Sequence, residues 1–181
     1  MNLGDALCSE SLSRLAASWL REDVPSLDVG GAVVGAGAGE AVLWMKQSGV
    51  LAGAPFVDAV FAQLGCAVQW KLAEGSRVHV GPGQRVEAAR VTGPMNRLLQ
   101  GERSALNCIA RVSGIATACA ELADKVRQAG WTGRVAGTRK TTPGFRICEK
   151  YAMAIGGEEE EVVVLVKVTK TKKKKKKKRW L

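Results

Sequence analysis

The sequence has few of the side chains that build metal centres and nucleophilic sites. It contains one histidine, His79, and five cysteines, none of which stands in a Cys-x-x-Cys pair. Zinc sites gather closely spaced Cys and His ligands, so no protein-bound metal site is expected. His79 has no nucleophile motif around it, and we interpret it as a structural residue. The odd number of unpaired cysteines favours free thiols in a reducing compartment, so we predict a cytoplasmic protein.

Long apolar runs are also missing. No stretch approaches the roughly 18 apolar residues of a transmembrane helix, so no membrane association is expected. The first 20 residues show no basic segment followed by an apolar run, which argues against a secretory signal. At 181 residues with 46% hydrophobic content, the chain has enough apolar side chains for a core, and global disorder is excluded.

Positive charge is abundant but unevenly placed. The formal net charge is +10, yet residues 158–181 alone hold ten of the 27 basic and four of the 17 acidic residues. The remaining body is therefore only mildly basic. Blocks of like charge are usually solvated, so we expect the tail, with its run Lys172–Arg179, to be mostly disordered.

The first half of the body predicts two helices and about four short strands. Apolar residues recur at helical spacing over Ser11–Asp23 and Ala54–Leu64, and Pro55 suits a first helical turn. Alternating character predicts the strands Ala41–Lys46, Ala67–Leu72, Val78–Val80 and Arg85–Val91. These elements are typical of an α+β sandwich, an antiparallel sheet with helices covering one face.

A glycine-rich segment lies between the first helix and the first strand. Its sequence over Gly30–Gly39 is GGAVVGAGAG, which contains GxGxG but not the GxGxxG of a dinucleotide-binding turn. No helical pattern opens after it. We therefore predict a flexible loop, because glycine clusters most often mark connections.

The second half of the body begins with a long helical pattern. Apolar residues recur every three or four positions over residues 94–129, and Gly130 is the expected stop. Gly101 and Gly114 weaken the pattern, so it predicts either two successive helices or one kinked helix. A strand at Gly133–Ala136, a loop and a helix at Phe145–Ile155 follow. Such a strand–loop–helix unit is half of a parallel βαβ repeat, in which ligands bind at the loop.

Cations mark the candidate sites. Arg139 and Lys140 stand side by side in the loop GTRKTTPG, with Thr138 beside them. Arginine can bind a carboxylate or phosphate through two nitrogens, and lysine adds a compact charge, so a small multiply charged anion would fit. The alternative is a solvated surface pair. Arg103 either pairs with Glu102 or another helix acid, or points into a site.

Four segments resemble the quinolinate phosphoribosyltransferase family, especially its vertebrate form. They are Trp19–Asp28, Ser48–Phe61, Gly101–Thr117 and Gly130–Gly157. The resemblance implies a chain of NAD biosynthesis, in which quinolinate and phosphoribosyl pyrophosphate give nicotinate mononucleotide, carbon dioxide and pyrophosphate. It implies magnesium bound with the phosphoribosyl pyrophosphate, and a homodimer or higher homo-oligomer.

The resemblance also implies roles for residues of this sequence. Arg139 and Lys140 would bind the quinolinate carboxylates, with Lys140 as the catalytic residue, and Thr138 would help to position the anion. Arg103 matches the family arginine that reaches quinolinate from the neighbouring subunit.

The resemblance further implies an organisation in three parts. Residues 1–117 would form the α/β sandwich with its linking helix, and residues 118–157 the first strand–loop–helix of an incomplete α/β barrel. Residues 158–181 would be an acidic, valine-rich and polylysine tail, which we interpret as a read-through or alternative splice end. A (β/α)8 barrel takes roughly 250 residues, so we expect the chain alone to be inactive. Lys167 is not assigned a role.

Two other functions are kept open. The chain could be a non-catalytic interaction fragment that docks on the full-length enzyme, or a polyanion binder acting through its basic tail. The tail has Trp180 as its one aromatic residue, and no nucleic-acid module precedes it, so no specific nucleic-acid partner is expected.

Overall fold

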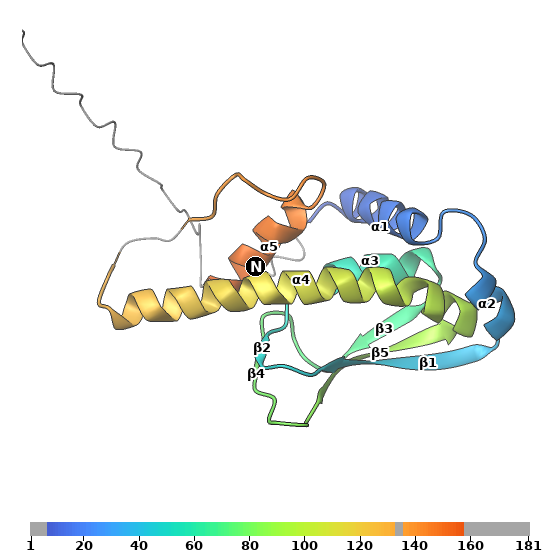
Figure 1. Ribbon diagram of the computed structural model, residues 1–181, viewed down its shortest axis with the longest axis horizontal. Coiled ribbons are helices and arrows are strands. Elements are labelled where there is room, and N and C mark those ends of the chain that lie inside the picture. The colour runs from blue at the N-terminus through green and yellow to red at the C-terminus, as the bar shows by residue number, and fades with distance from the viewer. Residues whose placement is uncertain (1–6, 133–135, 158–181) are drawn as a thin grey trace, which may run out of the picture.

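The computed structural model describes residues 7–132 and 136–157. In chain order, its elements are α1 (Ser9–Asp23), α2 (Val29–Val34), β1 (Ala38–Met45), β2 (Gly49–Val50), α3 (Ala54–Gln63), β3 (Ala67–Trp70), β4 (Arg77–Val78), β5 (Val86–Pro94), α4 (Met95–Gln128) and α5 (Arg146–Gly156). Helices α1, α3 and α4 lie over one face of the sheet, and α4 extends beyond the sheet toward α5 (Figure 1).

The sheet is antiparallel, as the sequence predicts. Its strand order is β1-β5-β3, with Ala41 opposite Val91 and a register shift between Leu43 and Trp44. Strands β2 and β4 form a separate two-stranded antiparallel pair. The fold is thus an α+β sandwich, and the described residues contain no closed barrel.

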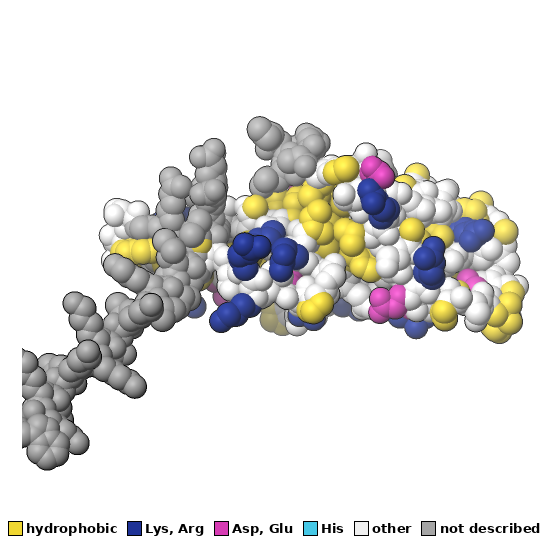
Figure 2. Space-filling model, turned by 90° about the horizontal axis from the view of Figure 1, so that it is seen from above, with side chains coloured by type: hydrophobic (Ala, Val, Ile, Leu, Met, Phe, Trp, Pro, Cys, Tyr) yellow, Lys and Arg dark blue, Asp and Glu magenta, His cyan; other side chains and the backbone are white. Residues whose placement is uncertain are grey.

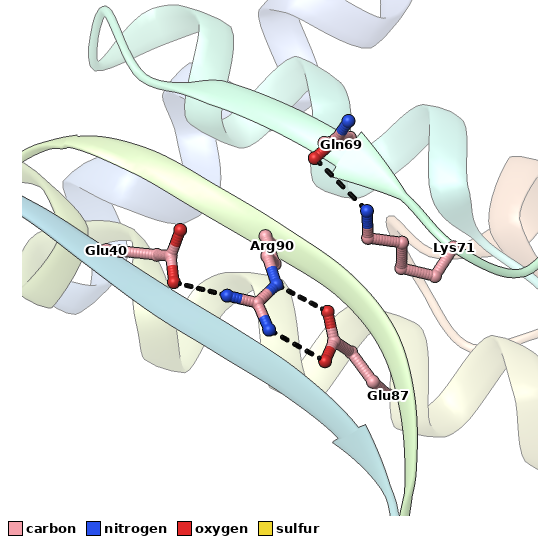
Figure 3. A network of polar contacts seen from close by, with 5 residues as sticks. All are labelled: Glu40, Gln69, Lys71, Glu87 and Arg90. Atoms are coloured by element: carbon pink, nitrogen blue, oxygen red, sulfur yellow. Dashed lines mark hydrogen bonds and ion pairs between the residues drawn. The ribbon is translucent and has the colours of Figure 1, made fainter.

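The face of the sheet opposite the helices is polar. Arg90 on β5 donates to Glu87 at 2.6 Å on its own strand and to Glu40 at 2.7 Å on β1 (Figure 3). Lys71 and Gln69 form a second pair beside this network, with 3.4 Å between Nζ and Oε1. These charges keep the solvent face hydrophilic while the apolar face packs on the helices.

One predicted loop is partly a helix. The sequence predicts a loop over Gly30–Gly39, but α2 occupies its first half, so that prediction was wrong there. The Asp28 carboxylate accepts a hydrogen bond from the Gly31 N–H at 2.8 Å, which caps the helix start. Gly35, with φ of 77°, ends the helix. The segment Val29–Val34 has no amphipathic period, so the apolar pattern does not predict this helix, which Asp28 caps and which packs against α4.

The long helix is continuous. Of the two predicted alternatives, neither two helices nor a kink is needed, because α4 runs unbroken for 34 residues. Gly101 is buried against α3, where a Cβ atom would lie 2.7 Å from Phe61 Cε1, so this glycine permits close helix packing. The predicted domain boundary at residue 117 falls inside α4, and the division into domains stays a prediction. Residues 133–135 of the predicted strand lie outside the described residues.

Two clusters of buried side chains share the helices. The first packs α1, α3 and the start of α4 on the sheet, and the second packs α3, the middle of α4 and α5 together. Trp19 contacts both clusters, and its ring centroid lies 6.3 Å from that of Phe56 and 6.1 Å from that of Phe145. Within the two described ranges, no helix combines the length and apolarity needed to cross a membrane.

Candidate functional site

The loop before α5 carries two adjacent cations. Thr138, Arg139 and Lys140 are exposed, and they follow the fully buried Ala136. The Lys140 N–H donates to Thr138 Oγ1 at 3.1 Å, which shapes the backbone between them. Across residues 7–132 and 136–157, no carboxylate lies within ion-pair distance of Arg139 or Lys140. The two positive charges are therefore available to an anionic ligand.

Arg103 occupies a different place. It projects from α4, and its Nε lies 3.1 Å from Oδ1 of Asp23, at the end of α1. The acid that pairs with it is thus a helix acid other than Glu102. The Arg103 side chain is 72% exposed, while that of Asp23 is 16% exposed. Asp23 thus engages Arg103 through Nε.

A groove of about 770 Å³ runs between α1, α4 and the end of the loop. Arg103, Asn107 and Arg111 follow each other at four-residue spacing, so they share one face of α4 along the groove. Trp19 of α1 and the segment Thr142–Phe145 also line the groove. Among the described residues, Arg111 has no ion-pair partner. The groove combines aromatic side chains with two guanidinium groups and the carboxylates of Glu22 and Asp23.

The structure does not bring all predicted residues together. Thr142, Pro143 and Gly144 line the groove with Arg103, whereas Thr138, Arg139 and Lys140 do not. Within one chain, the groove therefore contains Arg103 but not the Arg139–Lys140 pair. Viewed from above, Lys and Arg side chains gather beside a strip of exposed hydrophobic atoms (Figure 2).

Sequence reasoning missed the side chains that hold the loop. Arg146, Glu149 and Lys150 of α5 all bind residues of the segment 137–144. Their spacing places them on one helix face, and that spacing was the signal in the sequence. The sequence did not indicate which groups these side chains bind, because the loop folds back on α5 only in the tertiary structure.

Among the described residues, the cysteines and His79 do not form a second catalytic or metal-binding site. All five cysteines are free. A hydrogen bond with Cys148, followed by burial, raises the pKa of the Cys108 thiol, so this thiol stays protonated. His79 is exposed, and its Nδ1 lies 3.4 Å from Ser48 Oγ. In the part of the chain that the structure describes, no group of three or more His, Cys, Asp or Glu side chains could hold a metal ion.

Two family models match consecutive parts of the chain. The quinolinate phosphoribosyl transferase N-terminal domain matches residues 28–113, and the C-terminal domain of the same family matches residues 115–174. The second match includes the loop with Arg139 and Lys140. It also continues past residue 157, where the sequence resemblance was expected to end, into residues outside those described.

Curated relatives and solved structures agree with the family models. The chain is 56% identical over 147 residues to nicotinate-nucleotide pyrophosphorylase [carboxylating] of Homo sapiens, covering 81% of this chain and 48% of the human protein. The rat protein is 53% identical over 149 residues, with 82% and 48% covered. The chain thus spans about half the length of the curated relatives it matches.

Among solved structures, NadC from Streptococcus pyogenes superposes with a TM-score of 0.75 at 31% identity, covering 83% of this chain and 54% of that one. The nicotinate-nucleotide pyrophosphorylase from Francisella tularensis gives a TM-score of 0.77 at 26% identity, covering 88% and 56%. Sequence, fold and the two consecutive domain matches lead to one conclusion: the chain belongs to the quinolinate phosphoribosyltransferase family.

Proposed function

We propose that this chain contributes the quinolinate-binding cations of a phosphoribosyl transfer reaction in NAD biosynthesis. The observation that carries the proposal is the exposed Arg139–Lys140 pair, which no carboxylate of the described residues neutralises. Quinolinate has two adjacent carboxylates and needs at least two close positive charges. Arginine and lysine side by side supply a bidentate donor and a point charge for such a dianion.

In the proposed reaction, the quinolinate ring nitrogen takes ribose 5-phosphate from phosphoribosyl pyrophosphate, with release of pyrophosphate and carbon dioxide. Arg139 and Lys140 hold the two quinolinate carboxylates, with Lys140 as the catalytic cation. Fixed positive charge stabilises the negative charge that decarboxylation leaves on the ring carbon, which then takes a proton from solvent. Thr138 helps to orient the anion from the backbone turn that its hydroxyl stabilises.

Magnesium is implied by the substrate, not by this part of the chain. The Glu149 carboxylate, which is the acid bonded to the loop, accepts from the Thr142 N–H at 3.3 and 3.4 Å. The described residues therefore do not fit a protein-held magnesium site near the cations, and no step of the reaction is assigned to one. The free thiols are compatible with a reducing compartment, which supports a cytoplasmic location.

Titration calorimetry of the full chain with quinolinate tests the proposal. Arg139→Ala and Lys140→Ala should each weaken binding by about tenfold or more, since each removes a charge-assisted hydrogen bond. Lys71→Ala, on the far face of the sheet, removes the same charge and should leave binding unchanged. Nicotinate, with one carboxylate, should bind more weakly than quinolinate. Equal quinolinate binding by the wild type and by the double variant that carries both Arg139→Ala and Lys140→Ala would overturn the proposal.

A second candidate function follows from the position of Arg103. Arg103 lines a groove that does not include the Arg139–Lys140 pair, and the family resemblance implies that this arginine reaches quinolinate from a neighbouring subunit. We infer that the chain can dock on a full-length subunit and present Arg103 to the loop of that partner. This makes it an interaction fragment in a mixed dimer of the family.

Complementation tests this second function. A full-length relative with alanine in place of the arginine that matches Arg103 should regain activity when this chain is co-expressed. The Arg103→Ala chain should fail to restore activity, while Arg97→Ala, an exposed arginine of the same helix, should restore it. Elution of the two proteins in separate gel-filtration peaks, without restored activity, would refute the mixed dimer.

A further inference from the structure

Helix α5 holds the cationic loop through three side chains on one face. Lys150 Nζ donates to the carbonyl of Gly137 at 3.2 Å, at the start of the loop. Arg146 Nε donates to Thr141 Oγ1 at 3.0 Å, and its Nη2 makes a longer contact with the Arg139 carbonyl at 3.5 Å. Glu149 accepts from the Thr142 N–H through both carboxylate oxygens. The loop is thus fastened at its start, middle and end.

The opposite face of α5 is fixed in the core. Cys148 and Ala152 are fully buried, and Tyr151 is 5% exposed with its ring 5.3 Å from that of Phe56, edge to face. Gly156 lies against the Ala116 carbonyl of α4, where a Cβ atom would not fit. A helix held so closely on one face gives its other face fixed positions, so the loop is attached to a rigid support.

The charges of the three α5 side chains are directed to the loop backbone. Lys150 binds a carbonyl, Arg146 binds a hydroxyl and a carbonyl, and Glu149 binds an N–H. In contrast, the side chains of Arg139 and Lys140 have no partner among the described residues. The segment therefore contains two groups of cations: those that fix the backbone and those that remain open.

We propose that Arg146, Glu149 and Lys150 are positioning residues that pre-form the loop, so that Arg139 and Lys140 meet the dicarboxylate without first being ordered. This inference rests on the proposed function for its ligand. The hydrogen bonds from Arg146, Glu149 and Lys150 to the loop, here called the cradle, are a property of the free chain. Fixing a binding loop in advance removes an entropic cost from ligand binding. The three residues act through the loop and do not touch the ligand.

Limited digestion of the full chain with trypsin tests the cradle without any ligand. Trypsin cleaves after Arg139 and Lys140 only when the loop opens locally, and mass spectrometry separates these cuts from those in the tail. Glu149→Ala keeps both cleavage sites and should increase cleavage there roughly tenfold, because it removes a charge-assisted hydrogen bond. Glu121→Ala, an exposed acid of α4, is the matched control and should cleave as the wild type does.

A conservative variant and a binding measurement separate positioning from simple support. Glu149→Gln keeps an acceptor oxygen, so its cleavage rate should lie close to that of the wild type. Quinolinate should bind more weakly to Glu149→Ala and recover most of its affinity with Glu149→Gln. Absence of quinolinate binding by the wild type would count against the proposed function, while the digestion result would still decide on the cradle.

One combination of results would overturn the inference: equal cleavage after Lys140 in the wild type, Glu149→Ala and Glu121→Ala, with unchanged far-ultraviolet circular dichroism. If Glu149→Ala loses its helical signal, Lys150→Ala replaces it in the same comparison. That variant also keeps the Arg139 and Lys140 sites and should be cleaved faster at both. An unchanged rate in this folded variant would equally contradict the cradle.

Discussion

Two glycines in α4 have opposite surroundings, although both interrupt the same helical pattern. Gly114 faces open space, where an added Cβ atom would meet nothing within 4 Å. Gly101 faces α3, where a Cβ atom would lie 2.7 Å from Phe61 Cε1 and 2.9 Å from Leu64 Cδ1. Of the two glycines, only Gly101 is needed for packing.

The corresponding alanine variants should therefore change stability in opposite directions. Gly114→Ala should raise the free energy of unfolding by about 0.5–1 kcal/mol, because alanine loses less backbone entropy in a helix. Gly101→Ala gains the same propensity but forces α3 and α4 apart, so it should lower stability by about 1–3 kcal/mol. Urea denaturation measures both changes. A similar gain in both variants would contradict the close approach of α3 and α4 at Gly101.

Single residues also set the limit of what the sequence could predict about the site. The sequence predicts an anion site at Arg139 and Lys140 because adjacent cations, threonines and glycines follow a predicted strand, and this role stays a prediction. The partner of Arg103 was not identifiable, because Asp23 lies 80 positions earlier and meets it only when α1 packs beside α4. Ion pairs between distant helices depend on tertiary packing, which no local pattern encodes.

At the scale of elements, an ion pair ties the small β2–β4 unit to the long helix. Arg77 of β4 approaches Asp124 of α4, with 2.6 Å between Nη1 and Oδ2 and 3.3 Å between Nη2 and Oδ1. The hydrogen bond from Arg77 holds the pKa of Asp124 below its usual value. Asp124 is therefore more acidic in the folded chain than in the unfolded chain.

This shift predicts a pH-dependent contribution to stability. A lowered pKa stabilises the fold fully above the unfolded carboxyl value of about 3.9, and the contribution is lost as the pH falls toward and through the folded value. Asp124→Asn should thus melt at a lower temperature than the wild type at pH 6, and the gap should close as the pH approaches 2. Glu121→Gln, the exposed control, should show no such closing gap. A gap that stays constant with pH would contradict the role of the Asp124 charge.

Elements with an amphipathic stripe were predictable, and the others were not. α1 and α3 follow from their apolar spacing, and the structure confirms both within a few residues. α2 was missed because Val29 and Val33 are exposed, so the segment has no buried stripe. The continuity of α4 could not be decided either, because Gly101 and Gly114 both lower helix propensity and only the folded structure shows that the helix runs through them.

At the scale of the whole molecule, the two core clusters are linked. α4 contributes Ala105 and Ile109 to the first cluster, and Val112 and Ala116 to the second. Trp19 packs against both. Because one continuous helix and one large aromatic ring belong to both clusters, neither cluster can lose its packing without exposing apolar surface of the other.

The described body should therefore unfold in one cooperative transition. Far-ultraviolet circular dichroism and tryptophan fluorescence should give the same urea midpoint. Phe56→Ala in the second cluster should lower the free energy of unfolding by about 3–5 kcal/mol, the range for a buried phenylalanine, and should move both signals together. Leu20→Ala, a large-to-small change in the first cluster, should also move both signals together. Two separated transitions, with Phe56→Ala shifting only one of them, would mean that the second cluster folds independently and that the boundary predicted at residue 117 divides the molecule physically.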